Sequence, residues 1–329
     1  MSVRWLRATD VERCLPMAEA IDAMAEAFTA VHAGRVVMPL RLGLEAPAAG
    51  GTTLFMPAHD PGLGYTVLKM VSVYPGNPAR GLPAIAGLVI LVDGATGRPL
   101  AVMDGATLTA LRTGAASGAA TRALARDDAS VLAVLGAGAQ APYQVLAVCA
   151  VRPIRQVRIY NRTRTRAEAL AARLAARLGP EVETVIAATP AEAARGAHVI
   201  CTATASTEPL LGAADVAPGT HVNAVGSFRR GMRELARDLV VRGRPVFVDQ
   251  REAAQEEAGE LIDAFAAGAL EPGDLVELGA VLAGAHPGRV DPDQITVFKS
   301  CGLAAQDLYA AARVWERARE LGVGRDVVL

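Results

Sequence analysis

The sequence contains few cysteines, and none of them is spaced for a metal site. Its four cysteines, Cys14, Cys149, Cys201 and Cys301, lie far apart, and no two of them form a Cys-x-x-Cys motif. A metal site is therefore not expected, and each cysteine is expected to be a free thiol among apolar neighbours. Free thiols suit a reducing compartment, so the expected location is the cytoplasm.

The chain also lacks a marked net charge and a long apolar run. Its formal net charge is -1, so no overall positive field attracts nucleic acid or an anionic membrane surface. The strongest apolar stretch, residues 85–92, is too short to cross a bilayer. The N-terminal residues 1–10 carry two arginines and no apolar run, which is not the pattern of a signal peptide. No nucleic-acid or membrane partner is expected.

Apolar residues, in contrast, are abundant. They make up 52% of the 329 residues, against 20% charged residues, which is enough to bury two sizeable cores. A chain of this length is long for one compact unit, so two folded domains are expected and disorder is not.

The first third has the pattern of an α+β domain. Residues 16–32 carry apolar side chains at helical spacing, and Gly34 follows them. Short β-type runs come next, at residues 36–44, 52–57, 65–74, 82–93 and 100–104. Turn residues at 93–97, between the last two runs, are typical of a hairpin, so we expect a helix and a meandering sheet.

From residue 106 onward strands and helices alternate. A helix at 106–126 precedes strands expected at 130–135, 157–160, 182–186, 198–201, 220–225 and 246–248. Helices are expected from residue 140, at 165–178, at 191–195 and near Glu234. Strands joined by helical crossovers form a parallel sheet. We therefore expect an α/β fold: a doubly wound Rossmann domain over residues 113–303, plus an α+β domain over 1–112 to which the helical tail 304–329 returns.

A glycine turn follows the first strand of the second domain. The apolar strand leads into Gly-x-Gly-x-x-Ala and then into a helix. Gly136 permits the tight turn, Gly138 lets the backbone approach a pyrophosphate, and Ala141 allows close helix packing. Ala139 and Gln140 lie at the helix start, whose free N–H groups bind phosphates. The pattern predicts a dinucleotide site; the alternative is a glycine turn in a domain that binds no nucleotide.

The end of the second strand indicates which dinucleotide is bound. NAD sites usually place an acid there for the ribose hydroxyls. Here residues 160–166 read Tyr-Asn-Arg-Thr-Arg-Thr-Arg, with no acid to repel a 2′-phosphate. Arg162 can pair with phosphate, and Asn161 and Thr163 can donate hydrogen bonds, so NADP(H) is expected in preference to NAD(H). The alternative is that the arginines form a solvated helix start.

Five motifs, in this order, resemble the ornithine cyclodeaminase/μ-crystallin family. They are Lys-Met-Val-Ser-Val-Tyr-Pro-Gly-Asn at 69–77, Leu-Arg-Thr-Gly-Ala-Ala-Ser at 111–117, Gly-Ala-Gly-Ala-Gln at 136–140, Asn-Ala-Val-Gly-Ser at 223–227 and Glu-Ala-Gly-Glu at 257–260. The resemblance covers nearly the whole chain. It implies a homodimer formed through the N-terminal sheet domain and an active site in the cleft between the two domains.

The resemblance also assigns roles to three basic residues. Arg41, Lys69 and Arg112 match the family's residues that hold the carboxylate of an α-amino or α-imino acid. The residue pattern agrees, because Arg41 and Lys69 lie in otherwise apolar β-type runs and a charge is rarely buried without a partner. For each of them alone, an ordinary structural ion pair is the alternative.

The chain departs from the cyclodeaminases at two positions. Those enzymes use two acids to manage the substrate's distal amine, and the matching positions here are Leu54 and Phe228. Together with Met56 these residues form an apolar pocket, which would leave a distal ammonium group unpaired at a large energetic cost. An apolar or cyclic substrate is therefore favoured over ornithine.

The expected function is NADPH-dependent reduction of a C=N bond next to a carboxylate, as in pyrroline- or piperideine-2-carboxylate or in the imine of a 2-oxo acid. Arg41 and Arg112 would orient the carboxylate, and Lys69 would donate a proton or position a water. The residues expected along the nicotinamide and phosphates are Thr113, Val225, Gly226 and Ser227. Two alternatives stay open: a cyclodeaminase in which Glu45 or Asp60 supplies the missing acid, and an NADPH-bound carrier without enzymatic activity.

Overall fold

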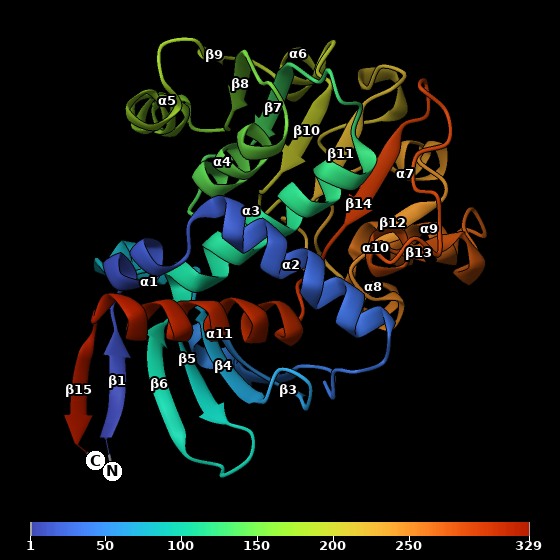
Figure 1. Ribbon diagram of the computed structural model, residues 1–329. Coiled ribbons are helices and arrows are strands. Elements are labelled where there is room, and N and C mark those ends of the chain that lie inside the picture. The colour runs from blue at the N-terminus through green and yellow to red at the C-terminus, as the bar shows by residue number, and fades with distance from the viewer. Residues whose placement is uncertain (1, 329) are drawn as a thin grey trace. The chain divides into compact units, whose positions relative to one another are not determined.

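The computed structural model describes residues 2–328, and the chain divides into two compact units (Figure 1). Of the described residues, those up to Arg112 and those from Leu303 form the first unit, and Thr113–Gly302 forms the second. Leu303 thus belongs to the first unit and not, as predicted, to the second. The reason is that it directly precedes and caps helix α11 (Ala304–Leu321), which packs on the first unit's sheet.

A mixed sheet forms the base of the first unit. Its strands, in spatial order, are β15 (Arg325–Val328), β1 (Ser2–Leu6), β6 (Pro99–Asp104), β5 (Ile85–Asp93), β4 (Tyr65–Val73), β3 (Gly51–Asp60) and β2 (Leu42–Ala46). Strands β2 to β6 are an antiparallel meander, and the predicted hairpin joins β5 to β6. The N-terminal strand β1 pairs in parallel with β6 and antiparallel with β15.

The strand predicted at 36–44 is wrong over most of its length. Strand β2 begins only at Leu42, and before it Val37 forms an isolated bridge with His59. The apolar residues of this run are exposed in this chain, with Val37 at 64%, Leu40 at 49% and Leu42 at 60%. An apolar run in a sequence therefore does not by itself show that its side chains are buried within the same chain.

Helices cover one face of this sheet. Helix α11 lies across β3, β4 and β5 and packs against α1 (Ala8–Cys14) and α2 (Met17–His32) (Figure 1). Helix α2 matches the predicted helix, and the first predicted residue, Pro16, is its N-cap. The C-terminal helix therefore brings its buried side chains onto the middle strands of a sheet built from the first third of the chain.

The second unit contains a parallel sheet. Its strands, in spatial order, are β13 (Leu275–Glu277), β12 (Val246–Val248), β14 (Thr296–Lys299), β11 (His221–Ala224), β10 (Val199–Thr202), β7 (Val131–Leu135), β8 (Gln156–Tyr160) and β9 (Glu183–Ile186). From β7 the chain runs outward to β9 and then returns to β10 on the other side. This reversal is the topological switch point of a doubly wound sheet and confirms the predicted Rossmann-type fold.

The remaining helices connect these strands. They are α3 (Gly105–Leu124), α4 (Ala141–Val151), α5 (Arg164–Leu178), α6 (Pro190–Ala194), α7 (Arg237–Arg242), α8 (Arg251–Glu257), α9 (Gly259–Ala266) and α10 (Leu278–Leu282). The helix predicted near Glu234 begins only at Arg237, because the Glu234 side chain is buried in a loop as a hydrogen-bond acceptor. No helix between residues 2 and 328 is long and apolar enough to span a membrane.

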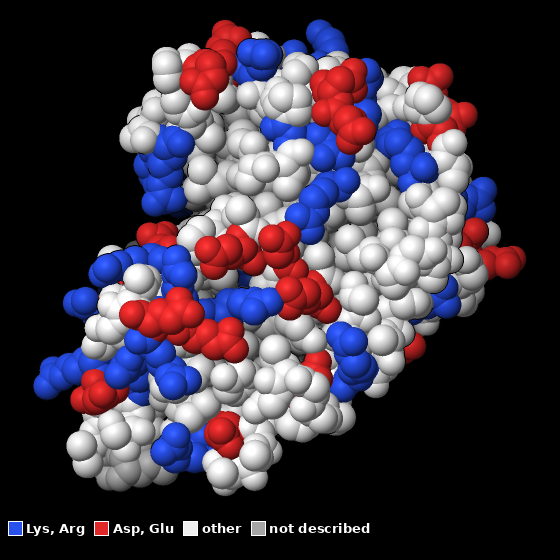
Figure 2. Space-filling model, in the orientation of Figure 1, with Lys and Arg blue, Asp and Glu red and all other residues white. Residues whose placement is uncertain are grey.

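The surface and the cysteines agree with the composition. Figure 2 shows Lys/Arg and Asp/Glu side chains interspersed over the face it presents, without a broad basic patch. All four cysteines are free thiols, as predicted. Burial raises the pKa of Cys201 and that of Cys149 to about 12, so both are protonated and unreactive at neutral pH.

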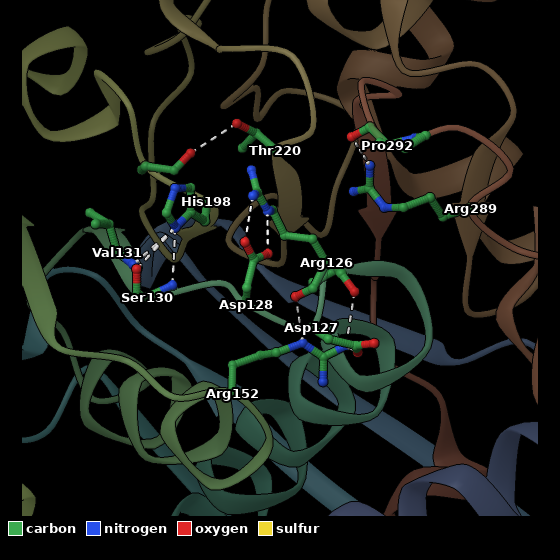
Figure 3. A network of polar contacts seen from close by, with 12 residues as sticks. Arg126, Asp127, Asp128, Ser130, Val131, Arg152, His198, Thr220, Arg289 and Pro292 are labelled. Carbon is green, nitrogen blue, oxygen red and sulfur yellow. Dashed lines mark hydrogen bonds and ion pairs between the residues drawn. The ribbon is translucent and has the colours of Figure 1, made fainter.

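Two arginines, Arg152 and Arg289, close the C-terminal end of helix α3. Figure 3 shows Arg152 beside Asp127 and Arg289 beside Pro292. Arg152 donates over 2.8–3.0 Å to three backbone carbonyls at or just after the end of α3, those of Arg122, Ala125 and Arg126. A further bond runs to the carbonyl of its neighbour Val151 at 2.7 Å. Arg289 donates to the carbonyl of Leu124 at 2.7 Å. The last carbonyls of a helix lack partners within the helix, and cationic donors also suit the negative end of the helix dipole. The arginines thus fix the end of α3 near the amino-terminal ends of strands in the second unit's sheet.

Replacing Arg152 should therefore destabilise the fold. We expect Arg152→Met to lower the free energy of unfolding by about 3 kcal/mol, because three carbonyls lose a charged donor. Urea denaturation measures this change. Arg155→Met is the matched control, since Arg155 is exposed and is expected to change stability by less than about 0.5 kcal/mol. Equal effects of the two substitutions would contradict the proposed role of Arg152.

Candidate active site

A buried lysine lies in the middle of the first unit's sheet. Lys69 is on β4, between Met56 on β3 and Val89 on β5, and only 1% of its side chain is exposed. An ammonium group in such a place requires a counter-charge. Helix α11 supplies it, because Oδ2 of Asp307 lies 2.6 Å from Nζ of Lys69 in an ion-pair contact.

The same carboxylate also binds Arg112. Nε of Arg112 donates to Oδ1 of Asp307 at 3.0 Å, and its Nη1 donates to Oε1 of Gln306 at 2.6 Å. Asp307 therefore bridges two cations, one through each oxygen. With Lys69 protonated, these two cations and one anion carry a formal charge of +1 in a buried place, which favours the binding of an additional anion.

The electrostatic surroundings place the pKa of Lys69 near neutrality. Its pKa is lowered from 10.5 to about 7, first by burial and then by the positive charge of Arg112; Arg41 adds to the shift, while Asp307 opposes it. Arg41 precedes β2 and lies near enough to act on Lys69, so the structure brings the three predicted basic residues together. A lysine with such a pKa can give up and regain a proton at neutral pH.

Two of the three apolar residues predicted for the substrate pocket lie on the strand next to this lysine. Leu54 and Met56 are two residues apart on β3, so their side chains point to the same face of the sheet. Met56 is the cross-strand partner of Lys69 and shares that face as well. Phe228 belongs to the second unit, in the loop after β11, where the guanidinium of Arg229 lies 5.9 Å from the centre of its ring.

The two acids considered as substitutes for a cyclodeaminase pair already have structural partners. The hydroxyl of Tyr309 donates to Asp60 at 2.6 Å, and the backbone N–H of Gly62 donates to it at 2.8 Å. Burial and this carboxylate raise the pKa of Tyr309 to about 12, so the hydroxyl remains a donor. Glu45 lies on the edge strand β2 and accepts from Thr52 at 2.7 Å. Neither arrangement leaves a carboxylate free beside Lys69.

The glycine turn of the second unit fits a dinucleotide pyrophosphate. Gly136 has a φ of +109°, and a side chain there would meet the carbonyl of Ala203, so only glycine suits the position. A side chain at Gly138 would point into open space, which leaves the backbone accessible to a ligand. Helix α4 begins directly after Gln140, whose buried Oε1 has no hydrogen-bond partner in the described chain. These features fit phosphate binding at the N-terminus of α4.

At the end of β8, from which the cofactor was predicted, the side chain of Asn161 has two hydrogen bonds within the protein. Oδ1 of Asn161 accepts from the backbone N–H of Ala137 at 3.1 Å, and Nδ2 donates to the carbonyl of Thr163 at 2.9 Å. The side chain of Asn161 thus fixes the glycine turn, and its contact with a phosphate stays a prediction. Arg162 and Thr163 are exposed, and within residues 2–328 Arg162 forms no ion pair that would compete with a ligand.

The loop after β11 contains a buried cluster that sequence reasoning missed. Val225, Gly226 and Ser227 lie there, close to the side chains of Glu234, Glu260 and Lys299. Thr113, on α3 in the same unit, is also buried. One signal was present in the sequence: the chain contains only two lysines among its 33 basic residues, Lys69 and Lys299, and each stands in or at the end of an apolar strand.

Comparison with known proteins identifies the family. The model of the ornithine cyclodeaminase/mu-crystallin family matches residues 3–322. The chain is 38% identical to a Delta(1)-pyrroline-2-carboxylate reductase of Bacillus cereus, over 98% of each chain. It is 36% identical to the ketimine reductase mu-crystallin of Mus musculus, over 90% of each chain.

Solved structures show the same architecture. The Thermococcus litoralis Delta(1)-pyrroline-2-carboxylate reductase, in complex with NADH and L-proline, matches with a TM-score of 0.95 and 36% identity, over 99% of this chain and all of the other. An archaeal alanine dehydrogenase dimer with bound NAD matches with a TM-score of 0.92 and 36% identity over the whole of both chains. The chain therefore belongs to the ornithine cyclodeaminase/mu-crystallin family, as its five motifs predicted.

Proposed function

We propose that the protein is a nicotinamide-dependent reductase of imino acids, which transfers hydride to the carbon of a C=N bond next to a carboxylate. The observation that carries this proposal is the buried group of Lys69, Arg112 and Asp307, which combines an excess positive charge with a lysine pKa of about 7. The pyrroline-2-carboxylate and ketimine reductases among its relatives support the same reaction class.

The residues of the first unit divide the work of this reaction. Arg112 has five N–H donors. The one on Nε binds Asp307 and one on Nη1 binds Gln306, so the other N–H groups can bind a substrate carboxylate. Lys69 donates the proton that the imine nitrogen needs when its carbon accepts hydride. Leu54 and Met56 contact a methylene-rich substrate on the same face of the sheet. A reduced nicotinamide, when bound, supplies the hydride.

We further propose that NADP(H) is preferred over NAD(H). The support is the strand end of β8, where residues 160–166 contain no acid and Arg162 is exposed and free of a protein counter-ion within the described chain. A bidentate guanidinium contact to a 2′-phosphate suits this position. The relatives of known structure hold NADH or NAD, so the preference concerns the residues of this chain and not the family as a whole.

A homodimer is proposed as the assembled state. Strand β2 and the segment before it expose Val37, Leu40, Leu42 and Leu44 on the first unit, each about half exposed or more. Contiguous exposed apolar side chains at a sheet edge usually mark an interface. The related alanine dehydrogenase is a dimer in its structure, which supports the same assembly here.

The proposed reaction predicts a clear substrate pattern. Pyrroline-2-carboxylate should oxidise NADPH stoichiometrically, whereas 1-pyrroline, the same ring without the carboxylate, should react at least about 100-fold more slowly because Arg112 loses its partner. Absorbance at the NADPH band measures both rates. Ornithine with oxidised cofactor should yield neither proline nor ammonia. Release of ammonia would favour the cyclodeaminase, and NADPH binding without oxidation by any imine would favour the carrier.

A second prediction concerns pH. Lys69 must be protonated to act as the acid, so kcat/KM for imine reduction should fall as the pH rises through about 7, the pKa of Lys69. Asp307 raises this pKa, so Asp307→Asn should move the falling limb to lower pH as well as reduce the rate. Asp128→Asn, which removes an exposed ion pair with Arg126, is the control and should leave the limb in place. An unmoved limb in Asp307→Asn would exclude Lys69 as the acid.

A third prediction tests the cofactor preference. NADPH should bind more tightly than NADH, and Arg162→Ala should weaken NADPH binding by about 1.5 kcal/mol, roughly tenfold, while leaving NADH binding unchanged. Fluorescence titration with each cofactor measures the effect. Arg173→Ala, an exposed arginine further along α5, should change neither affinity. Equal loss of both cofactors in Arg162→Ala would show that the arginine does not contact the 2′-phosphate.

A further inference from the structure

Three buried charged side chains converge on the loop after β11, and none of them has a role in the proposed reaction. Glu234 is fully buried, Lys299 is 1% exposed and Glu260 is 2% exposed. They come from the loop before α7, from the end of β14 and from α9. Burying three charges is energetically costly unless each is paired and hydrogen-bonded. The contacts of these side chains therefore indicate their structural role.

Glu234 holds the N–H groups of the loop. Its Oε2 accepts from the backbone N–H of Gly226 at 2.8 Å and from that of Ser227 at 3.2 Å. Oε1 accepts from the backbone N–H of Thr204, in the loop after β10, at 2.6 Å. A side chain at position 226 would clash with this carboxylate, so the close contact requires glycine there. One carboxylate therefore ties the loops after β10 and β11 together.

Lys299 holds the same loop from its carbonyl side. Its Nζ donates to the carbonyls of Ala224 at 3.2 Å and Ser227 at 2.5 Å, and to the hydroxyl of Ser227 at 2.7 Å. That hydroxyl in turn donates to Oε2 of Glu260, whose Oε1 lies 3.5 Å from Nζ. Burial lowers the pKa of Lys299, but the carboxylate of Glu260 and its acidic neighbours raise it more, so the ammonium stays charged.

The position of this loop in the sheet indicates which part of a dinucleotide it faces. A doubly wound sheet binds one mononucleotide half on each side of its switch point, beyond the carboxyl ends of the strands. Here β7 and β8 carry the phosphate turn and Arg162, which belong to the adenosine half. The loops after β10 and β11 lie on the other side of the switch point and therefore belong to the nicotinamide half.

We propose that Lys299 and Glu260 are positioning residues for the nicotinamide half of the site, acting through Ser227. They hold residues 224–227, and with them the adjoining Phe228, in one conformation, while the adenosine half of the site is independent of them. The proposal rests on the proposed function only for the binding of a dinucleotide and not for the reduction of an imine.

The test compares two ligands that differ in the nicotinamide alone. Dissociation constants are measured by calorimetry for NADPH and for 2′-phospho-ADP-ribose, which keeps the adenosine half, the pyrophosphate and the second ribose but lacks the nicotinamide. In Lys299→Met and Glu260→Gln, NADPH binding should weaken by about tenfold or more, because charge-assisted contacts to the loop are lost, and 2′-phospho-ADP-ribose binding should change by less than about twofold. Equal losses for both ligands, or no loss for either, would overturn the proposal.

Ser227→Ala gives the same test with little risk to folding. It removes the hydroxyl that links Lys299 to Glu260 but leaves the bonds from Lys299 to the two carbonyls. It should therefore weaken the binding of NADPH, by less than Lys299→Met does, and leave the binding of 2′-phospho-ADP-ribose unchanged. Equal affinities of Ser227→Ala and the unmodified protein for NADPH would contradict a role for the hydroxyl link. The imine assay tests the reductase proposal separately. NADPH binding without imine reduction would overturn the reductase proposal and leave the positioning role of Lys299 and Glu260 intact. Equal losses of affinity for both ligands in variants of an active enzyme would overturn the positioning role and leave the reductase proposal intact.

Discussion

The carboxylate of Asp307 is the group on which the first unit's chemistry depends. Lys69 and Arg112 are both buried, and without an anion between them their mutual repulsion and loss of hydration would be prohibitive. Asp307 follows Arg112 by 195 positions in the sequence and is delivered by helix α11. The docking of the C-terminal helix on β3 to β5 is thus both a packing event and the step that assembles the basic site.

The two lysines of the chain show how burial can serve opposite purposes. Burial, and then the positive charges of Arg112 and Arg41, lower the pKa of Lys69 to about 7, so it can gain and lose a proton at neutral pH. Lys299 lies among carboxylates that raise its pKa, so its charge is permanent and serves as an anchor. An arginine stays charged at any physiological pH and carries a larger, planar head group, so it would suit neither place. Every other Lys or Arg position in this sequence is an arginine.

Sequence reasoning was effective where the signal was local. The alternation of strands and helices and the turn at Gly136 and Gly138 depend on neighbouring residues, and they predicted the doubly wound fold correctly. The roles of Asp307 and Glu260 were not predicted, because each acts on partners that are distant in the sequence, and spacing does not reveal such pairs. The run from Val37 shows the opposite error, since local apolarity predicted a strand over 36–44 whereas β2 begins only at Leu42.

The geometry at the end of β8 also limits how strong a cofactor preference can be. The amide of Asn161, whose contact with a phosphate stays a prediction, joins Ala137 to Thr163 and so maintains the phosphate turn itself. In the proposed preference for NADP(H), recognition of the 2′-phosphate would depend mainly on Arg162, which is exposed. An exposed charge contact is screened by salt and competes with hydration. The missing acid removes repulsion against the phosphate, and the single arginine adds a modest attraction, so discrimination between the two cofactors is expected to be graded and sensitive to ionic strength.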